Sequence, residues 1–317
     1  MSRPILRQEA LLGNAYLALA ALIWGCAFVA QSVGNEYVGP FTFQTSRSLL
    51  GAATLAPLIC MRRLKARRRG TWRPLSPRSR RTLWLGGIAC GVLLAVAINL
   101  QQVALLEASA GKAGFLTALY ILFVPIVGAF VGKRPRPLLW FCVLMAAVGL
   151  YLLSVKDGFS IARADVLLIL CAVVFTGHIM VVDAVSPMVS GVQLSCLQFL
   201  VAGVLSAIPM LIYEQPSLSA ILRGWLPIGY AGVLSSGVAY TLQILGQRKT
   251  RPTMASLLMS LESVFAALAG LIILGERMDA RELLGCAIMF GAILLAQLAQ
   301  VPQGAVPVDA PESPTGI

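Results

Sequence analysis

Residues 49–59 read LLGAATLAPLI and residues 201–211 read VAGVLSAIPML, so that Gly51 and Pro57 stand at the same spacing as Gly203 and Pro209. Weaker matches keep the same order along the chain, such as AALIWGCAFV at 20–29 with CAVVFTGHIM at 171–180. Matches that keep their order over two long segments indicate an internal duplication. We therefore expect one repeat at 13–154 and a second at 164–299, flanked by an N-terminal segment at 1–12 and a tail at 300–317.

Composition places these repeats in a membrane. Of the 317 residues, 58% are hydrophobic and 12% are charged, whereas about a quarter of the residues in a soluble domain are charged. The apolar residues gather in runs of about 20, the length of helix that crosses the hydrocarbon core of a bilayer. We expect an all-α membrane protein with ten transmembrane helices, at 13–32, 41–60, 82–104, 113–131, 137–154, 164–184, 193–213, 224–246, 253–274 and 281–299.

The basic residues set the orientation. The loop expected at 61–81 contains no Asp or Glu, and its cations are Arg62, Arg63, Lys65, Arg67, Arg68, Arg69, Arg73, Arg78, Arg80 and Arg81. The positive-inside rule places this loop in the cytoplasm, where membrane lipids of negative charge are a partner. Both termini then lie in the cytoplasm, and the Pro-rich tail is expected to be disordered. We expect the protein to lie in the plasma membrane. A basic patch alone does not indicate nucleic-acid binding, so we expect no nucleic-acid partner.

The number of helices in each repeat bears on function. Because five is odd, the second repeat enters the membrane from the opposite side, and the two repeats are inverted. Inverted repeats can exchange conformations, so that one central cavity opens alternately to each side of the membrane. The sequence therefore favours a secondary active transporter that works by alternating access.

Three ionisable residues stand out inside the expected spans: Arg47, His178 and Glu262. A charge at the bilayer centre costs about 2.5–3.5 kcal/mol on insertion scales, so such groups usually face a cavity or a partner. Glu262 is a candidate for proton coupling or substrate binding, and the alternative is a structural ion pair with Arg47. His178 is a second proton-coupling candidate, and the alternative is a structural hydrogen bond. Arg47 is either a charge partner or an anchor for an anionic group.

Two pairs of polar residues recur at matching places in the two repeats. Asn99 and Gln102 stand three residues apart in the third span, and Tyr240 and Gln243 stand three residues apart in the eighth. On a helix this spacing puts both side chains on one face. We expect these stripes to line the cavity, and the alternative is hydrogen bonding between helices.

Aromatic residues and one proline add to the expected cavity wall. Trp24 and Tyr120, like Tyr240, could stack on a planar solute or fill the core. Pro125 lies inside the fourth span and removes a backbone hydrogen bond. We therefore expect a break in that helix at Pro125.

Several short motifs resemble an EamA-type member of the drug/metabolite transporter superfamily over about residues 13–299. They are Trp24-Gly25, Gly39-Pro40 followed by Arg47, Ser109-Ala110-Gly111-Lys112-Ala113-Gly114-Phe115-Leu116, Leu261-Glu262-Ser263-Val264-Phe265-Ala266-Ala267 and Gly275-Glu276-Arg277. The resemblance implies a ten-helix basket whose cavity is lined by the first, third, fourth, sixth, eighth and ninth helices. It also implies transport of a small polar metabolite, an amino acid or a drug-like solute, with export expected and proton coupling common.

The sequence gives less support to other classes of function. The seven cysteines show no metal-ligand spacing, and the chain lacks the G-x-x-x-x-G-K-[ST] loop, so we expect no metal, no cofactor and no use of ATP. A membrane-embedded enzyme that modifies lipids would need catalytic residues clustered near one interface, whereas the ionisable residues fall on three spans. We expect no enzymatic activity. A non-transporting scaffold subunit is the other alternative, and a homodimer is compatible with the sequence.

Overall fold

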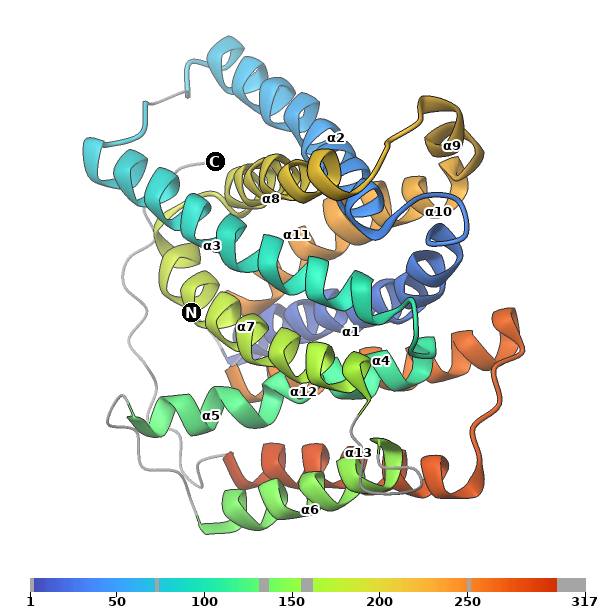
Figure 1. Cartoon of the computed structure of the whole chain (residues 1–317). Helices are drawn as coiled ribbons and strands as arrows, with labels where there is room; N and C mark the ends of the chain where they lie inside the picture. Colours follow the sequence, from blue (N-terminus) through green and yellow to red (C-terminus); the bar gives the residue numbers. More distant parts are fainter. Residues whose placement is uncertain (1–2, 72–73, 131–136, 155–161, 250–251, 301–317) are drawn as a thin grey trace.

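Helices make up the ordered elements of this chain. The computed structural model describes residues 3–71, 74–130, 137–154, 162–249 and 252–300, and this part of the chain contains no β-strand (Figure 1). The first half forms α1 (Arg3–Gly34), α2 (Pro40–Arg68), α3 (Pro77–Ala104), α4 (Ala110–Thr117), α5 (Tyr120–Phe130) and α6 (Pro137–Ser154). The all-α prediction is confirmed for the described residues.

The second half is also helical, with a larger share of irregular turns. It forms α7 (Arg163–Val185), the 3₁₀ turn η1 (Ser186–Met188), α8 (Gly191–Tyr213), α9 (Leu218–Arg223), α10 (Trp225–Gly229), the π-helix η2 (Tyr230–Ala239), α11 (Tyr240–Gln247), α12 (Pro252–Ala269), the π-helix η3 (Gly270–Leu274) and α13 (Ala280–Gln300). Within the described residues, five segments are long and apolar enough to cross a membrane: Leu11–Gly34, Pro77–Ala104, Arg163–Met188, Gly191–Tyr213 and Trp225–Gln247. The full count of ten spans stays a prediction.

Local sequence signals begin several helices. Pro40 and Pro77 occupy the first turns of α2 and α3, where a missing N–H costs nothing because that group has no partner in the helix. The hydroxyl oxygen of Ser76 accepts a hydrogen bond of 3.1 Å from the N–H of Ser79, and Ser109 caps α4 in the same way. Helix α2 has no such cap from Gly39 and uses a residue from the other half of the chain, described below.

Two local expectations are wrong. Helix α2 continues to Arg68 and α3 begins at Pro77, so much of the basic segment expected as a loop at 61–81 is helical. The fourth span breaks at Ala118 and Leu119, between α4 and α5, and α5 runs through Pro125. A proline inside a helix removes one hydrogen bond but does not require the helix to end, and here the break lies about two helical turns before Pro125. Of the tail predicted at 300–317, Gln300 ends α13 and residues 301–317 lie outside the described residues.

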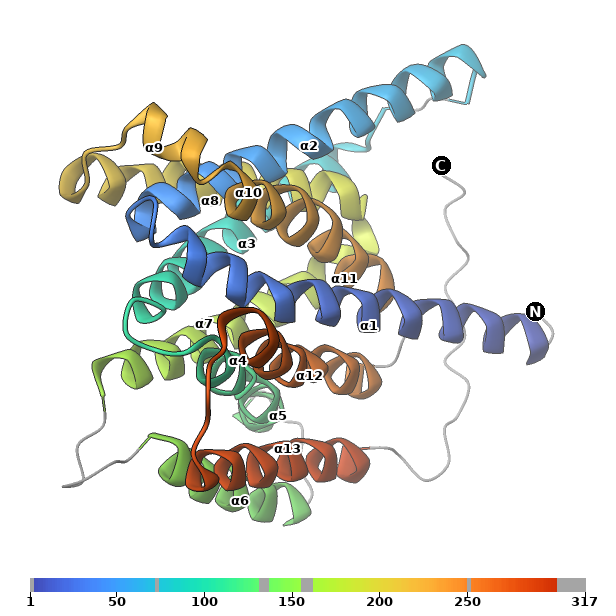
Figure 2. The ribbon, with the colours of Figure 1, turned by 90° about the vertical axis from the view of Figure 1, so that its right-hand side faces the viewer.

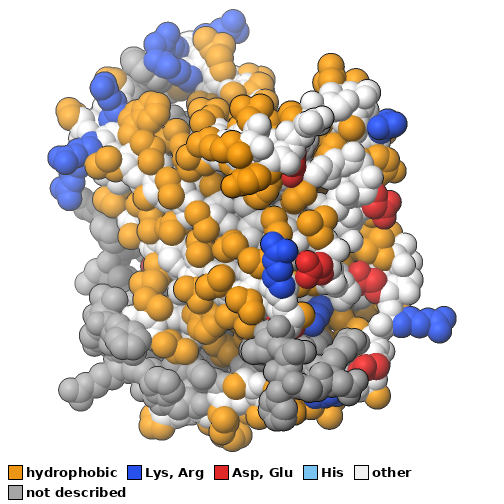
Figure 3. Space-filling model, viewed as in Figure 1, with side chains coloured by type: hydrophobic (Ala, Val, Ile, Leu, Met, Phe, Trp, Pro, Cys, Tyr) orange, Lys and Arg blue, Asp and Glu red, His pale blue; other side chains and the backbone are white. Residues whose placement is uncertain are grey.

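The surface is apolar and the interior holds polar groups. Large aliphatic side chains are exposed along one face of α3, at Leu85, Ile88, Val92 and Val96, and along α8, at Leu200, Val204, Ile208 and Leu211. Figure 3 shows hydrophobic side chains over much of the visible face, a group of basic ones at the end with the α2–α3 connection, and acidic side chains interspersed with further basic ones toward the opposite side. Buried groups include Gln31, Gln44 and Gln102. An exposed apolar surface of this extent suits contact with lipid.

The helices pack in pairs that join the two halves of the chain. Helix α2 packs on α8, α4 on α12, and α6 on α13, the last pair forming a layer of its own at one side of the molecule (Figure 2). Gly51 in α2 permits close approach to η2, since a Cβ atom there would lie 2.7 Å from Cβ of Ser236. Both α2 and α8 carry an internal proline, Pro57 and Pro209. The two segments with the matching Gly and Pro, in α2 and α8, are therefore direct neighbours in space.

Candidate functional site in the central cavity

A small cavity lies between helices of both halves of the chain. Its volume is about 40 Å³, which is room for a few water molecules. The side chains around it come from α1, α2, α3, α4, α5, α7, η2, α11 and α12, and they are Trp24, Ala27, Phe28, Gln31, Arg47, Gln101, Thr117, Tyr120, Phe175, His178, Ile179, Ser235, Tyr240, Gln243 and Glu262. The second helix takes part through Arg47, which the family resemblance did not imply.

Arg47 brings a positive charge to the cavity wall. Its side chain is 2% exposed, and its three hydrogen bonds all go to uncharged acceptors. Nη1 donates to Oε1 of Gln31 at 2.9 Å, Nη2 to Oγ of Ser235 at 3.1 Å, and Nε to Oγ of Ser236 at 3.2 Å. These contacts fix the guanidinium group between α1 and η2 without neutralising its charge.

Glu262 brings a carboxyl group to the same cavity. It is 5% exposed, and its Oε1 accepts a hydrogen bond of 2.9 Å from the hydroxyl of Tyr120. Among the described residues no ion pair within 4 Å joins Glu262 to Arg47. The structure therefore does not contain the Arg47–Glu262 ion pair that was one reading of the sequence.

His178 lies deep in α7 and is 1% exposed. Its Nε2 lies 3.0 Å from Oε1 of Gln198 on α8. The imidazole ring also meets the ring of Tyr240 nearly edge-on, with centroids 6.2 Å apart. His178 thus has a hydrogen bond to a neighbouring helix and a place in the cavity wall at the same time.

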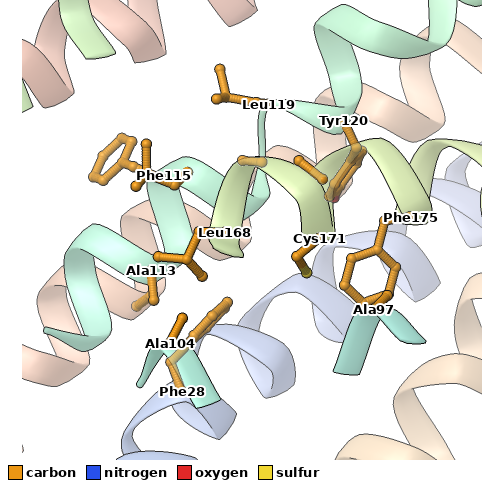
Figure 4. Packing of buried hydrophobic residues seen from close by; sticks show 14 of the residues in the cluster. Phe28, Ala97, Ala104, Ala113, Phe115, Leu119, Tyr120, Leu168, Cys171 and Phe175 are labelled. Carbon is orange, nitrogen blue, oxygen red and sulfur yellow. The ribbon is translucent and has the colours of Figure 1, made fainter. Parts of the chain in front are cut away.

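Aromatic rings form much of the apolar part of the wall. Trp24 and Tyr240 meet edge-on with centroids 4.8 Å apart, and Tyr240 also meets Phe199 at 4.9 Å. Tyr120 and Phe175, from α5 and α7, lie side by side near Cys171 (Figure 4), with ring centroids 6.4 Å apart. The aromatic residues both pack against one another and line the cavity.

The polar stripe expected in the third span faces elsewhere. Asn99 donates to Oγ of Ser206 at 2.7 Å, and Gln102 donates to Oδ1 of Asn35 at 2.7 Å, so both link helices instead of lining the cavity. Gln101 takes the cavity position and donates to Oγ1 of Thr117 at 3.1 Å. The rotation of α3 about its axis decides which of three neighbouring polar residues faces inward, and spacing alone could not give that rotation.

Several other residues that line the cavity could not be identified from the sequence, because residues of these types are common in hydrophobic cores. Phe28 and Phe175 look like ordinary apolar filling, and Ser235 looks like a small packing residue. Gln31 had a usable signal, because it is a polar residue near the end of an apolar run. Its bond to Arg47 follows from tertiary packing and has no local signature.

Polar contacts join helices at both ends of the assembly. At the end where α2 and α4 begin, the carboxylate of Glu214 caps α2, and Glu276 accepts from the N–H of Ala110 at 2.8 Å to cap α4. At the other end, Nη2 of Arg248 donates to the carbonyl oxygens of Ser186 and Val189. The contacts of Glu214 and Glu276 tie the two halves of the chain together, and the contact of Arg248 joins two segments of the second half.

Known proteins are similar in sequence to this chain over nearly its whole length. The profile of the EamA-like transporter family matches residues 11–155 and 162–298. The chain is 27% identical to an uncharacterized transporter of Archaeoglobus fulgidus, over 89% of this chain and 84% of that protein. It is 25% identical to the uncharacterized inner membrane transporter YedA of Escherichia coli K12, over 92% of each chain. A solved crystal structure covering 92% of this chain and 97% of its own is similar in fold, with a TM-score of 0.62 at 22% identity.

Proposed function

Because the chain belongs to the EamA-like transporter family, we propose that it is a secondary active transporter that carries a small polar solute across the plasma membrane by alternating access. The observation that carries the proposal is a cavity between helices of both halves of the chain that is lined by the buried side chains of Arg47, His178 and Glu262. Charged groups inside a membrane are costly and mark solute or ion pathways. Membrane transport itself is what the family and the transporter-named relatives support.

The proposed architecture is two inverted five-helix repeats with ten spans. In support, the family profile matches the chain twice, once in each half. Helix contacts follow the same pattern: α3 packs on α7 and α8, while η2 at the corresponding place of the second half packs on α1 and α2. Corresponding helices α2 and α8 also pack on each other. If a two-fold axis relates the two halves, a helix of one half should pack on the same helices of the other half as its counterpart does in return. The contacts of α3 and η2 have this pattern.

The small cavity volume fits a cycle in which the solute enters after helices separate at one end. The contacts of Glu214 and Glu276 at one end and of Arg248 at the other would open in turn. We propose export as the direction, on family resemblance, and proton coupling through Glu262 with His178 as a second candidate. Glu262 has the position for this role, since its side chain borders the cavity and its Oε1 accepts a hydrogen bond from Tyr120.

The main alternative function is that of a membrane-embedded enzyme that modifies lipids. The three ionisable residues converge in space, so their scatter along the sequence does not argue against an enzyme. Their side chains are 1–5% exposed and meet deep in the helix assembly, whereas a lipid-modifying site would lie near one interface. Transport therefore explains the position of the cluster better than lipid chemistry does.

The test is solute flux in proteoliposomes with an imposed pH gradient, on wild type, Glu262→Gln and the exposed-site control Glu107→Gln. We expect gradient-driven flux in the wild type and in Glu107→Gln, and its loss in Glu262→Gln. Failure of a broad panel of polar solutes to move would contradict transport. Flux that ignores pH, with Glu262→Gln active, would remove only the proton role. Cells that carry the gene should accumulate less of the solute if export is right.

A further inference from the structure

A second cleft lies at the end of the molecule that carries the α2–α3 connection, and it shares no lining residue with the central cavity. Its volume is about 470 Å³, in the range of sites that bind small molecules. The side chains that line it come from the connection and the start of α3, and they are Leu75, Pro77, Arg80, Arg81 and Trp84. A group of basic side chains marks this end of the molecule in Figure 3. The cleft thus has two cations and an apolar wall.

The charge of this cleft suits an anion. Arg80 and Arg81 are adjacent and exposed, and residues 61–81 contain no Asp or Glu. Among the described residues no carboxylate forms an ion pair with either side chain. A guanidinium group presents paired N–H donors that match the oxygens of a phosphate. Two such groups beside one cleft are suited to bind a phosphate or a phosphodiester.

The helix that carries the cleft continues as an apolar strip. Leu85, Ile88, Val92 and Val96 follow Arg81 at intervals of three or four residues, so they share its face of α3. Each side chain of the strip is 42–57% exposed, while α3 packs on α7 and α8. The strip rises about 16 Å along the helix, close to half of the roughly 30 Å hydrocarbon core of a bilayer. It therefore has the length of one leaflet.

Trp84 indicates the depth of the cleft in the bilayer. Its side chain is 53% exposed, and it lies one helical turn after Arg80 and one turn before Ile88. Tryptophan is enriched at the membrane–water interface, where its ring sits at the level of the lipid headgroups. A soluble phosphate would contact only the arginines, whereas a phospholipid would contact the arginines, the indole ring and the apolar strip. The combination favours a lipid.

We propose that this cleft binds one phospholipid of net negative charge, with its phosphate on Arg80 and Arg81, its glycerol group against Trp84 and one acyl chain along the apolar strip of α3. The positive-inside rule assigns a side of the membrane to a basic segment, whereas this assignment places a single lipid at named residues. It goes beyond the proposed function and does not depend on transport.

The first experiment compares two lipids on the wild-type protein in a neutral detergent. Native mass spectrometry follows titration with phosphatidylglycerol, which is anionic, and with phosphatidylcholine of the same acyl chains, which has no net charge. We expect the first phosphatidylglycerol to bind at least about 10-fold more tightly than the first phosphatidylcholine. Inorganic phosphate should displace it no more than sodium chloride of equal ionic strength does, because free phosphate gains nothing from the apolar strip.

Two pairs of substitutions then locate the site. Arg80→Gln combined with Arg81→Gln should weaken binding of the first phosphatidylglycerol by about 10-fold to 30-fold, because both phosphate contacts are lost. Arg68→Gln combined with Arg69→Gln is the matched control, since it removes two exposed cations of the same basic segment at the end of α2. The control pair should change binding by less than about 3-fold, the effect of distant charges near the membrane surface.

Three outcomes overturn the proposal. Equal weakening by the two pairs would show diffuse attraction to the whole basic segment. Phosphatidylcholine that binds as tightly as phosphatidylglycerol would show that the charge is not recognised. Displacement by inorganic phosphate beyond that by sodium chloride would show a site for a soluble anion. The comparison of lipids on the wild type does not depend on any variant, and unfolding temperatures in phosphatidylcholine show whether each variant is folded.

Discussion

The carboxylate of Glu214 binds the first turn of α2 through Thr42, accepting from its backbone N–H at 2.7 Å and from its hydroxyl at 2.6 Å. Glu214 also accepts from the N–H of Phe41 at 2.9 Å. A residue just after α8 thus provides the cap that α2 lacks in its own sequence. The negative charge also suits the positive end of the helix dipole.

Loss of this cap should loosen the end of the molecule where α2 begins. We expect Glu214→Ala to lower the free energy of unfolding by about 1–2 kcal/mol, because two N–H groups and one hydroxyl lose an ionised acceptor. Glu36→Ala, at an exposed position of the neighbouring turn, is the control and should change little. Thermal unfolding in nanodiscs measures both. Equal stability of the two variants would show that water replaces the cap without cost.

The ion pair between Lys112 and Asp165 ties α4 to α7 at 2.8 Å. Asp165 is fully buried, so Lys112→Met leaves a carboxylate without a counter-charge and should destabilise the protein by roughly 3–5 kcal/mol. The double variant Lys112→Met with Asp165→Leu should recover most of this loss, since it removes both charges. The free energies of unfolding of the wild type, the two single variants and the double variant together form a double-mutant cycle that measures the interaction. Additive losses would mean that the two residues do not interact.

Close contact between α1 and α12 depends on Gly25. A Cβ atom at this position would lie 2.3 Å from Cβ of Phe265 and 2.9 Å from the backbone nitrogen of Ala266. We expect Gly25→Ala to destabilise the protein by about 1–3 kcal/mol through overpacking. Gly229→Ala is a matched control in α10, where nothing lies within 4 Å of the added atom, and it should be neutral or slightly stabilising. Similar melting temperatures for both variants would refute the close packing.

Inverted repeats predict the side of the membrane on which each connection lies. We expect Cys at Lys65 to be cytoplasmic and Cys at Glu107 or Arg223 to be external, each introduced with Cys60→Ser because Cys60 is exposed. An impermeant thiol reagent added to intact cells should label the positions 107 and 223, and should label position 65 only after permeabilisation. Labelling of 65 and 223 together would disprove the inverted arrangement.

Much of the helix layout could be predicted because the bilayer imposes a length on each apolar run. Helix α6 matches the predicted 137–154 in full. Arg47, His178 and Glu262 were identifiable because ionisable residues are rare in such runs, and all three border the cavity. Their biochemical roles remain predictions, since position shows only that they can meet a solute.

Details that depend on helix rotation could not be predicted. Gln101, not Asn99 or Gln102, faces the cavity because neighbours fix how α3 turns. The eighth span contains the π-helix η2, which has more residues per turn than an α-helix and so brings Ser235 and Tyr240 to the cavity together. The break between α4 and α5 arises at Ala118, where no proline or glycine marks it.

The pair formed by α6 and α13 stands apart from this machinery. These helices pack chiefly on each other, and none of their described residues borders the cavity (Figure 2). Selection on them should accordingly act through membrane thickness and lipid composition, while selection for solute choice acts on the other helices. Homologues adapted to different membranes could therefore exchange this pair and keep their specificity.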